Sequence, residues 1–213
     1  MLRAAAVVLL LALGAGGKAH AQQNLPANGL FLVAKPSMSD PNFTRTVVLV
    51  TQAEDASTVG VIINRPISQE LSQLLPPEFP AQNYRDRIYF GGPVMRQTIF
   101  ALFRSEAPPA ATAFHVLKNV YLTAHADNIK QLLAAPTAKY RLYAGFSGWA
   151  PRQLESEFMR EDWYVLPADE AMLFRNSAAG LWEELVERAA SRGPRTRDSG
   201  VTMFATWSGP CAC

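Results

Sequence analysis

Three short apolar segments decide the fold: Gly29-Leu-Phe-Leu-Val-Ala34, Thr46-Val-Val-Leu-Val-Thr51 and Thr58-Val-Gly-Val-Ile-Ile63. Each is rich in branched apolar residues and has the length of a strand, so all three are predicted to be buried β-strands. The first two are separated by Pro36-Ser-Met-Ser-Asp-Pro-Asn-Phe43, whose prolines and Asp and Asn side chains favour turns. We expect this connection to be an ordered loop.

Strands and helices alternate irregularly along the rest of the chain. Further strands are predicted at residues 88–90, 98–103, 120–123, 140–146 and 163–166. Helices are predicted at 68–75 with Ser68 as its cap, at 126–134, from Pro151 onward, and along an apolar stripe from Leu181 to Ala189. Because no regular strand-helix-strand rhythm is present, we expect one α+β domain.

The composition is that of a folded domain with balanced charge. Of its 213 residues, 49% are hydrophobic and 18% are charged, which provides a core and argues against disorder. The net charge is +2, and it falls to zero if Arg3 and Lys18 are removed with a leader. Without a basic excess the chain lacks the bulk electrostatic attraction to nucleic acid, so we do not expect a nucleic-acid partner.

The N-terminus has the pattern of a secretory signal peptide. A basic start, Met1-Leu-Arg3, precedes an apolar run from Ala4 to Leu13 and the small-x-small sequence Ala19-His-Ala21. The run is too short to span a bilayer, so a leader of residues 1–21, a soluble domain of residues 22–192 and a periplasmic location are predicted. The alternative is a wrongly assigned start and a cytoplasmic protein.

The C-terminal residues 193–213 are expected to be a tail outside the domain. Gly193-Pro194 would end the last helix, and the residues that follow show no apolar period. Cys211 and Cys213 are the only cysteines, so no disulfide can close a long loop. This pair can bind a soft metal, form a local disulfide, link two chains or have no role.

Tests for catalytic motifs argue against an enzyme. Gly145-Phe-Ser-Gly148 lacks the second glycine of a nucleophile elbow, because Trp149 stands there, and every histidine precedes Ser147. His125, Asp127 and Ser147 are formally available as a triad but lie close together in sequence. We expect no catalytic residues, no metal site and no cofactor, with a hydrolase as an alternative.

An acidic cluster of Glu155, Glu157, Glu161 and Asp162 is either a solvated helix face or an acid/base site.

Four loops have the composition of binding loops: residues 36–43, 64–66, 91–94 and 145–155. The residues predicted to bind a small anion or a protein partner are Asn64, Arg65, Gly92, Trp149, Arg152, Gln153 and Glu155. The expected features are an electropositive helix start after Pro151, with Trp149 as an apolar wall. The alternative is that Trp149 belongs to the core.

Several segments together resemble the AlgH/YqgE family of bacterial proteins. They are Pro36 to Val47, Gly60-Val-Ile-Ile-Asn-Arg-Pro66, Gly91-Gly-Pro-Val94, Gly145-Phe-Ser-Gly-Trp-Ala-Pro-Arg-Gln-Leu-Glu155, Trp163 to Asp169, and Leu173-Phe174 with Leu181-Trp182. Their order matches from about Gly29 to Glu187. The resemblance implies a compact single-domain α+β fold with coiled, branching, mainly antiparallel sheets. It implies no settled activity, since the family is mostly uncharacterised and its regulatory label derives from a link to alginate synthesis.

The chain departs from that family in its leader, in its tail and at Arg152, where members usually have glycine. Members are normally cytoplasmic, so the leader argues against a transcriptional role. Our leading hypothesis is therefore an exported, non-catalytic binding or adaptor domain. The alternatives are an intracellular transcriptional regulator and a hydrolase that uses Ser147 or the pair Glu155 and Glu157.

Overall fold

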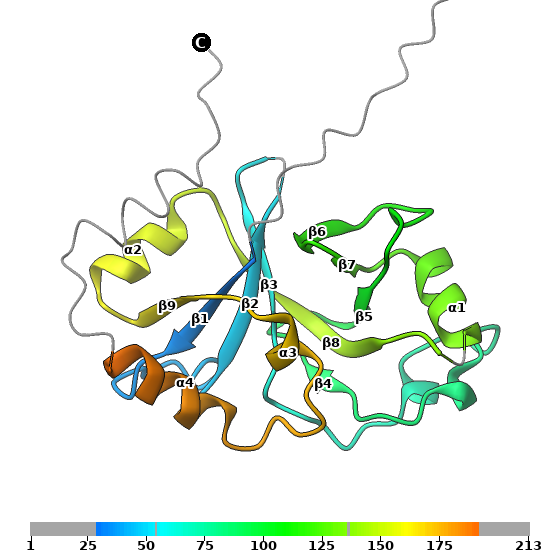
Figure 1. Ribbon diagram of the computed structural model, residues 1–213, viewed down its shortest axis with the longest axis horizontal. Coiled ribbons are helices and arrows are strands. Elements are labelled where there is room, and N and C mark those ends of the chain that lie inside the picture. Colours follow the sequence, from blue (N-terminus) through cyan, green and yellow to red (C-terminus); the bar gives the residue numbers. More distant parts are fainter. Residues whose placement is uncertain (1–28, 54, 136, 192–213) are drawn as a thin grey trace, which may run out of the picture.

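The computed structural model describes residues 29–53, 55–135 and 137–191 (Figure 1). The strands of this part are β1 (Leu30–Ala34), β2 (Val47–Gln52), β3 (Thr58–Ile62), β4 (Tyr89–Phe90), β5 (Val94–Arg104), β6 (Phe114–Leu117), β7 (Val120–Thr123), β8 (Tyr140–Trp149) and β9 (Trp163–Pro167). The α-helices are α1 (Ala126–Ala134), α2 (Gln153–Met159), α3 (Glu170–Leu173) and α4 (Leu181–Ala190), and the 3-10 helices are η1 (Leu71–Gln73) and η2 (Ala81–Asn83). The expected α+β fold is confirmed.

The strands form one mainly antiparallel sheet in the order β6-β7-β5-β8-β3-β2-β1-β9, with β4 parallel to β8 off this path. Strand β8 pairs with β5 and β4 through its first half and with β3 through its end, so it is the branch point of the sheet. Figure 1 shows β1, β2 and β9 on one side with α2 and α4, and β5 to β7 on the other side with α1.

Both faces of the sheet are covered, which gives three apolar clusters. The central cluster lies between strands of both halves and α4, and it includes Phe31, Tyr143 and Leu185. A second cluster covers the outer face of β1 to β3 with α2 and the loop around Phe43. The third covers β5 and β8 with α1 and the segment between β3 and β4. Because both faces of these strands are buried, their sequences are continuously apolar rather than alternating.

Gly145 reverses the side-chain alternation of β8. Before it, Tyr143 faces the central cluster and Ala144 faces outward; after it, Phe146 packs on the central cluster and Trp149 faces outward. Side chains alternate strictly along a regular strand, so one irregular residue is required. Gly145 supplies it with a φ of +73°, and an added Cβ would lie 2.6 Å from the Gly92 carbonyl oxygen.

Several predicted elements differ from the structure. The helix expected at 68–75 is wrong, because only the short η1 forms and Glu70, not Ser68, precedes it. The helix expected from Pro151 begins two residues later, because Arg152 has a φ of +67° and cannot be helical. Strand β6 was missed, while β5 and β8 are longer than predicted. The short lengths of η1 and β6 explain why local sequence patterns do not reveal them.

Candidate functional site

Asn64 holds the loop that joins β1 and β2. Its side-chain Oδ1 accepts a hydrogen bond from the Val47 amide at 2.8 Å, and its Nδ2 donates to the Arg45 carbonyl at 3.0 Å. Arg45 has a φ of +55°, a conformation that residues other than glycine seldom adopt. Asn64 therefore supports a strained turn at the start of β2.

Arg65 binds the same loop from its other side. Its guanidinium donates to the Asn42 carbonyl at 2.8 Å and to the Thr44 carbonyl at 3.0 Å. It also lies over the Phe90 ring, as does the exposed Arg96, at 5.8 and 5.6 Å from the ring centre. Burial lowers the pKa of Arg65, which still leaves it charged at neutral pH.

Trp149 belongs to a buried aromatic cluster. Its ring stacks on Phe43 at 5.8 Å and meets Trp163 edge-on at 6.3 Å, and only 3% of the residue is exposed. The carboxylate of Glu157 accepts hydrogen bonds from both indoles, at 3.0 Å from Trp149 and 2.8 Å from Trp163. Two buried indole N–H groups are thus satisfied by one carboxylate at the edge of the cluster.

Gly92 allows two chain segments to touch. A Cβ at this position would lie 2.3 Å from the Phe146 carbonyl oxygen, which is too close for any residue other than glycine. Next to it, the buried Ser147 hydroxyl donates to the Gly91 carbonyl at 3.1 Å. Both contacts join the start of β5 to β8.

The remaining predicted binding residues lie at the start of α2. Arg152 and Glu155 are exposed, and Gln153 accepts a hydrogen bond from the Ala150 amide at 3.1 Å through its side-chain oxygen. This helix has seven residues, which gives little dipole for an anion.

The predicted residues therefore do not form one exposed surface, because Gly92 and Trp149 are buried while Asn64 and Arg65 bind backbone groups. The loop of residues 36–46 links Asn64 and Arg65 to Trp149, because Phe43 enters the aromatic cluster while neighbouring carbonyls bind Arg65. Arg152, Gln153 and Glu155 precede or begin α2, which lies well apart from β4 in Figure 1. Their role in binding stays a prediction.

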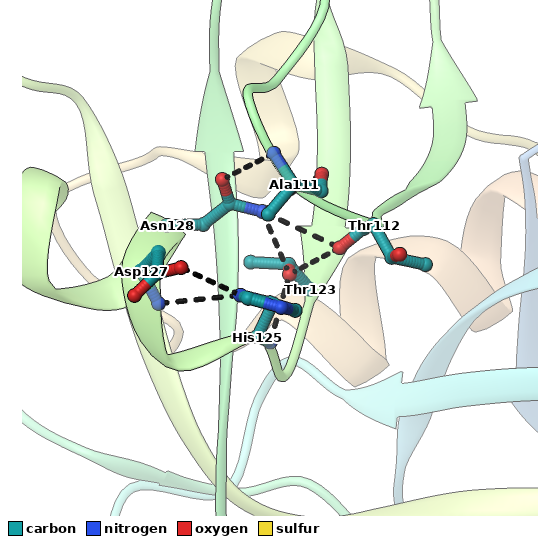
Figure 2. Close-up of polar contacts among 6 residues, drawn as sticks. All are labelled: Ala111, Thr112, Thr123, His125, Asp127 and Asn128. Atoms are coloured by element: carbon teal, nitrogen blue, oxygen red, sulfur yellow. Dashed lines mark hydrogen bonds and ion pairs between the residues drawn. The ribbon is translucent and has the colours of Figure 1, made fainter.

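His125 and Asp127 lie at the N-terminus of α1 (Figure 2). The Nδ1 of His125 accepts a hydrogen bond from the Asp127 amide at 3.3 Å, and this nitrogen is 3.8 Å from the Asp127 carboxylate. The hydroxyl of Ser147 donates to Gly91 instead of to a histidine. The histidine thus acts as a helix cap, and the serine has a structural partner.

Beside this cap, Asn128 is buried in a polar network. Its side chain accepts from the Ala111 amide at 3.2 Å and donates to the Ala111 carbonyl at 3.1 Å, and it also bonds to Thr112 and Thr123 (Figure 2). The network ties the loop before β6 to α1.

Among the described residues, no three or more His, Cys, Asp or Glu side chains group as a metal site would require. Within the same residues, no helix has the length and apolarity needed to cross a membrane.

A pocket of about 1090 Å³ is a feature that the sequence did not predict. All of its lining residues come from the segment between β3 and β4. A β-bridge between Pro66 and Tyr89 joins the two ends of this segment. We call it the 66–88 pocket; its lining is Pro66 to Ser72, Leu75 to Pro77, Phe79, Ala81, Gln82 and Tyr84 to Ile88. The apolar residues Leu71, Leu75 and Phe79 were a visible signal in the sequence that this segment packs against the domain.

Comparison with known proteins agrees with the fold and the motifs. A family model described as AlgH-like matches residues 31–192. The chain belongs to the AlgH-like family. A UPF0301 protein from Rhodococcus jostii is 30% identical over 75% of this chain and 81% of its own, and one from Mycobacterium tuberculosis is 32% identical with the same coverage. The names of these relatives assign no reaction or ligand.

Two solved structures resemble this AlgH-like domain. The solution structure of the AlgH protein from Pseudomonas aeruginosa has a TM-score of 0.62 at 30% identity and covers 80% of this chain and 90% of that one. A crystal structure of a Corynebacterium diphtheriae protein also has a TM-score of 0.62, at 25% identity, over 78% and 88%. The family resemblance noted from the motifs is thus confirmed.

Proposed function

We propose that this AlgH-like protein is an exported, non-catalytic binding or adaptor domain and that the 66–88 pocket is its binding site. The pocket itself is the observation that carries the proposal. Its volume of about 1090 Å³ is slightly above the usual range of small-molecule sites, about 300 to 1,000 Å³, and apolar walls with polar rim residues line it. By contrast, most of the polar side chains that the sequence predicted as binding residues, namely Asn64, Arg65 and Gln153, form hydrogen bonds to the protein's own backbone.

A neutral fluorescent probe, N-phenyl-1-naphthylamine, tests the pocket. We expect its fluorescence to rise with the purified protein and Gln82→Trp, which fills the pocket opening, to weaken binding at least five-fold. Gln131→Trp is the matched control, because Gln131 is exposed on α1 and does not line the pocket. Equal binding by all three proteins would contradict the proposal. Loss of binding in Arg152→Gln/Glu155→Gln alone would move the site to α2.

Export is supported by the sequence pattern of residues 1–21, which lie outside the described residues. Cell fractionation followed by mass measurement of the N-terminus tests it. We expect a periplasmic chain that begins at Gln22. A full-length chain in the cytosol would overturn export and leave the intracellular regulator as the better hypothesis.

A further inference from the structure

The walls of the 66–88 pocket are anchored by the protein's own hydrogen bonds. Where the two ends of the segment meet, the Ile67 amide donates to the Ile88 carbonyl at 2.9 Å. At the far end the Asn83 side chain donates to the Leu133 carbonyl at 3.0 Å, which fastens η2 to the end of α1. Because both ends are fastened, the pocket needs little ordering when a ligand enters, and that lowers the entropic cost of binding.

The inner wall of the pocket is apolar. Leu71, Phe79 and Ile88 are buried there, and Leu75 is half-buried. Tyr84 contributes its ring, while its hydroxyl donates to the Arg87 carbonyl at 2.9 Å and accepts from the Leu142 amide at 3.3 Å. Burial raises the pKa of Tyr84, so this side chain is neutral at physiological pH. A ligand therefore needs a substantial apolar part.

The charged rim of the pocket carries two arginines and two carboxylates, and the carboxylates already have partners within the protein. Asp86 lies between Arg85 and Arg87, but one oxygen accepts from the Arg87 amide at 2.7 Å and the other is 3.9 Å from Nε of the buried Arg141. Neither guanidinium of the two rim arginines has a side-chain partner among the described residues. The only other charged lining residue in the described part is Glu70, whose carboxylate accepts from Ser72 at 3.4 Å.

We propose that the 66–88 pocket binds a small amphipathic anion, an apolar chain or ring that ends in a carboxylate. The apolar part would cover the wall formed by Leu71, Leu75 and Phe79, and the carboxylate would pair with Arg85 and Arg87. A guanidinium offers paired donors that match the geometry of a carboxylate, and the rim has two of them two residues apart. This inference rests on the proposed function, because it names the ligand class of the same pocket.

Two probes with the same chain and opposite charge test the ligand class. Dodecanoate and dodecyltrimethylammonium are titrated below their micelle concentrations into the purified, isotope-labelled protein, and amide shifts locate binding. We expect dodecanoate to shift amides of residues 66–88 and to bind at least ten-fold more tightly than the cation. Arg85→Gln/Arg87→Gln is expected to weaken dodecanoate binding at least ten-fold. Lys118→Gln/Arg160→Gln, which removes the same charge away from the pocket, is expected to change it less than two-fold.

The outcomes separate this inference from the proposed function. If both probes bind equally, or if the double arginine variant binds dodecanoate normally while its melting temperature is unchanged, the pocket does not select anions and the inference fails. If N-phenyl-1-naphthylamine binds in the pocket and dodecanoate does not, again only the inference fails. If no probe shifts residues 66–88, both proposals are overturned.

Discussion

Arg152 occupies a position that favours glycine. Its φ of +67° lies in the left-handed region, where a Cβ is crowded by the backbone. The Cβ of Arg152 therefore costs stability at this turn.

Arg152→Gly is expected to stabilise the protein by about 0.5 to 1 kcal/mol, because glycine relieves the left-handed strain. Denaturant unfolding measures the change. Arg152→Ala is the control, since it removes the same charge and chain but keeps a Cβ, and it should give no gain. A stability loss in the glycine variant would show that the guanidinium itself supports the turn.

Trp149 was predicted as either a recognition residue or a core residue, and its burial identifies it as core. Truncation to alanine would leave a cavity beside Phe43 and Trp163 and remove one indole from Glu157. We expect Trp149→Ala to lower the free energy of unfolding by about 3 to 5 kcal/mol, as for other large aromatic truncations. Trp149→Phe, which keeps most of the volume, should cost less than half as much. A loss below about 1 kcal/mol for the alanine variant would be inconsistent with this packing.

At the scale of elements, polar side chains fasten loops to the sheet and helices. Asn64 and Arg65 hold the loop between β1 and β2, and Asn128 holds the loop before β6 against α1. Each side chain binds backbone groups of a loop that regular secondary structure does not satisfy. The loops of this protein are therefore ordered by a few side chains.

Asn128→Ala is expected to lower stability by about 1 to 3 kcal/mol, because partly buried hydrogen bonds to the backbone of Ala111 and Thr112 are lost and the buried Thr123 hydroxyl loses a donor. Hydrogen exchange should speed up most in residues 110–113 and in the first turn of α1. Asp127→Asn is the neighbouring control; it changes only an exposed carboxylate 3.8 Å from His125 Nδ1 and should cost less than about 1 kcal/mol. Unchanged exchange in both variants would show that the network does not hold the loop.

At the scale of the whole molecule, buried tyrosines set the stability at alkaline pH. Burial raises the pKa of Tyr84 and Tyr143 in the folded state above the unfolded value of about 10. The unfolded chain therefore loses these protons first. Stability contributed by the neutral tyrosines is complete below about pH 10 and falls as the pH rises toward the raised folded-state values.

We expect the free energy of unfolding to fall above about pH 10, by up to about 1.4 kcal/mol per pH unit for each of the two tyrosines. Tyr143→Phe should remove one such contribution from the slope. At pH 7 it should cost little, because the buried Tyr143 hydroxyl has no hydrogen-bond partner among the described residues. Denaturant unfolding from pH 7 to pH 11 measures both effects, and an unchanged alkaline slope in the variant would contradict the assignment.

The sequence by itself determined the local elements and the family. The apolar runs of β1, β2 and β3, the stripe of α4 and the turn residues of the 36–43 loop all act over a few neighbouring positions, so their pattern is visible in the chain. The ordered motifs likewise identified the AlgH-like family and, through it, the mainly antiparallel sheet. Short elements such as η1 and β6 were beyond this kind of inference, because three or four residues are too few to show a period.

Only the tertiary structure decided what the predicted site residues do. Asn64 and Arg65 bind backbone carbonyls 19 to 23 residues away, and Trp149 is buried because Gly145 reverses the alternation of β8 and places the indole between Phe43 and Trp163. The 66–88 pocket exists because a bridge between Pro66 and Tyr89 joins the ends of its segment, and because Asn83 bonds to Leu133 of α1, 50 residues further along the chain. Packing and hydrogen bonding between residues far apart in sequence leave no periodic signal, and that is the physical reason these features appear only in the folded protein.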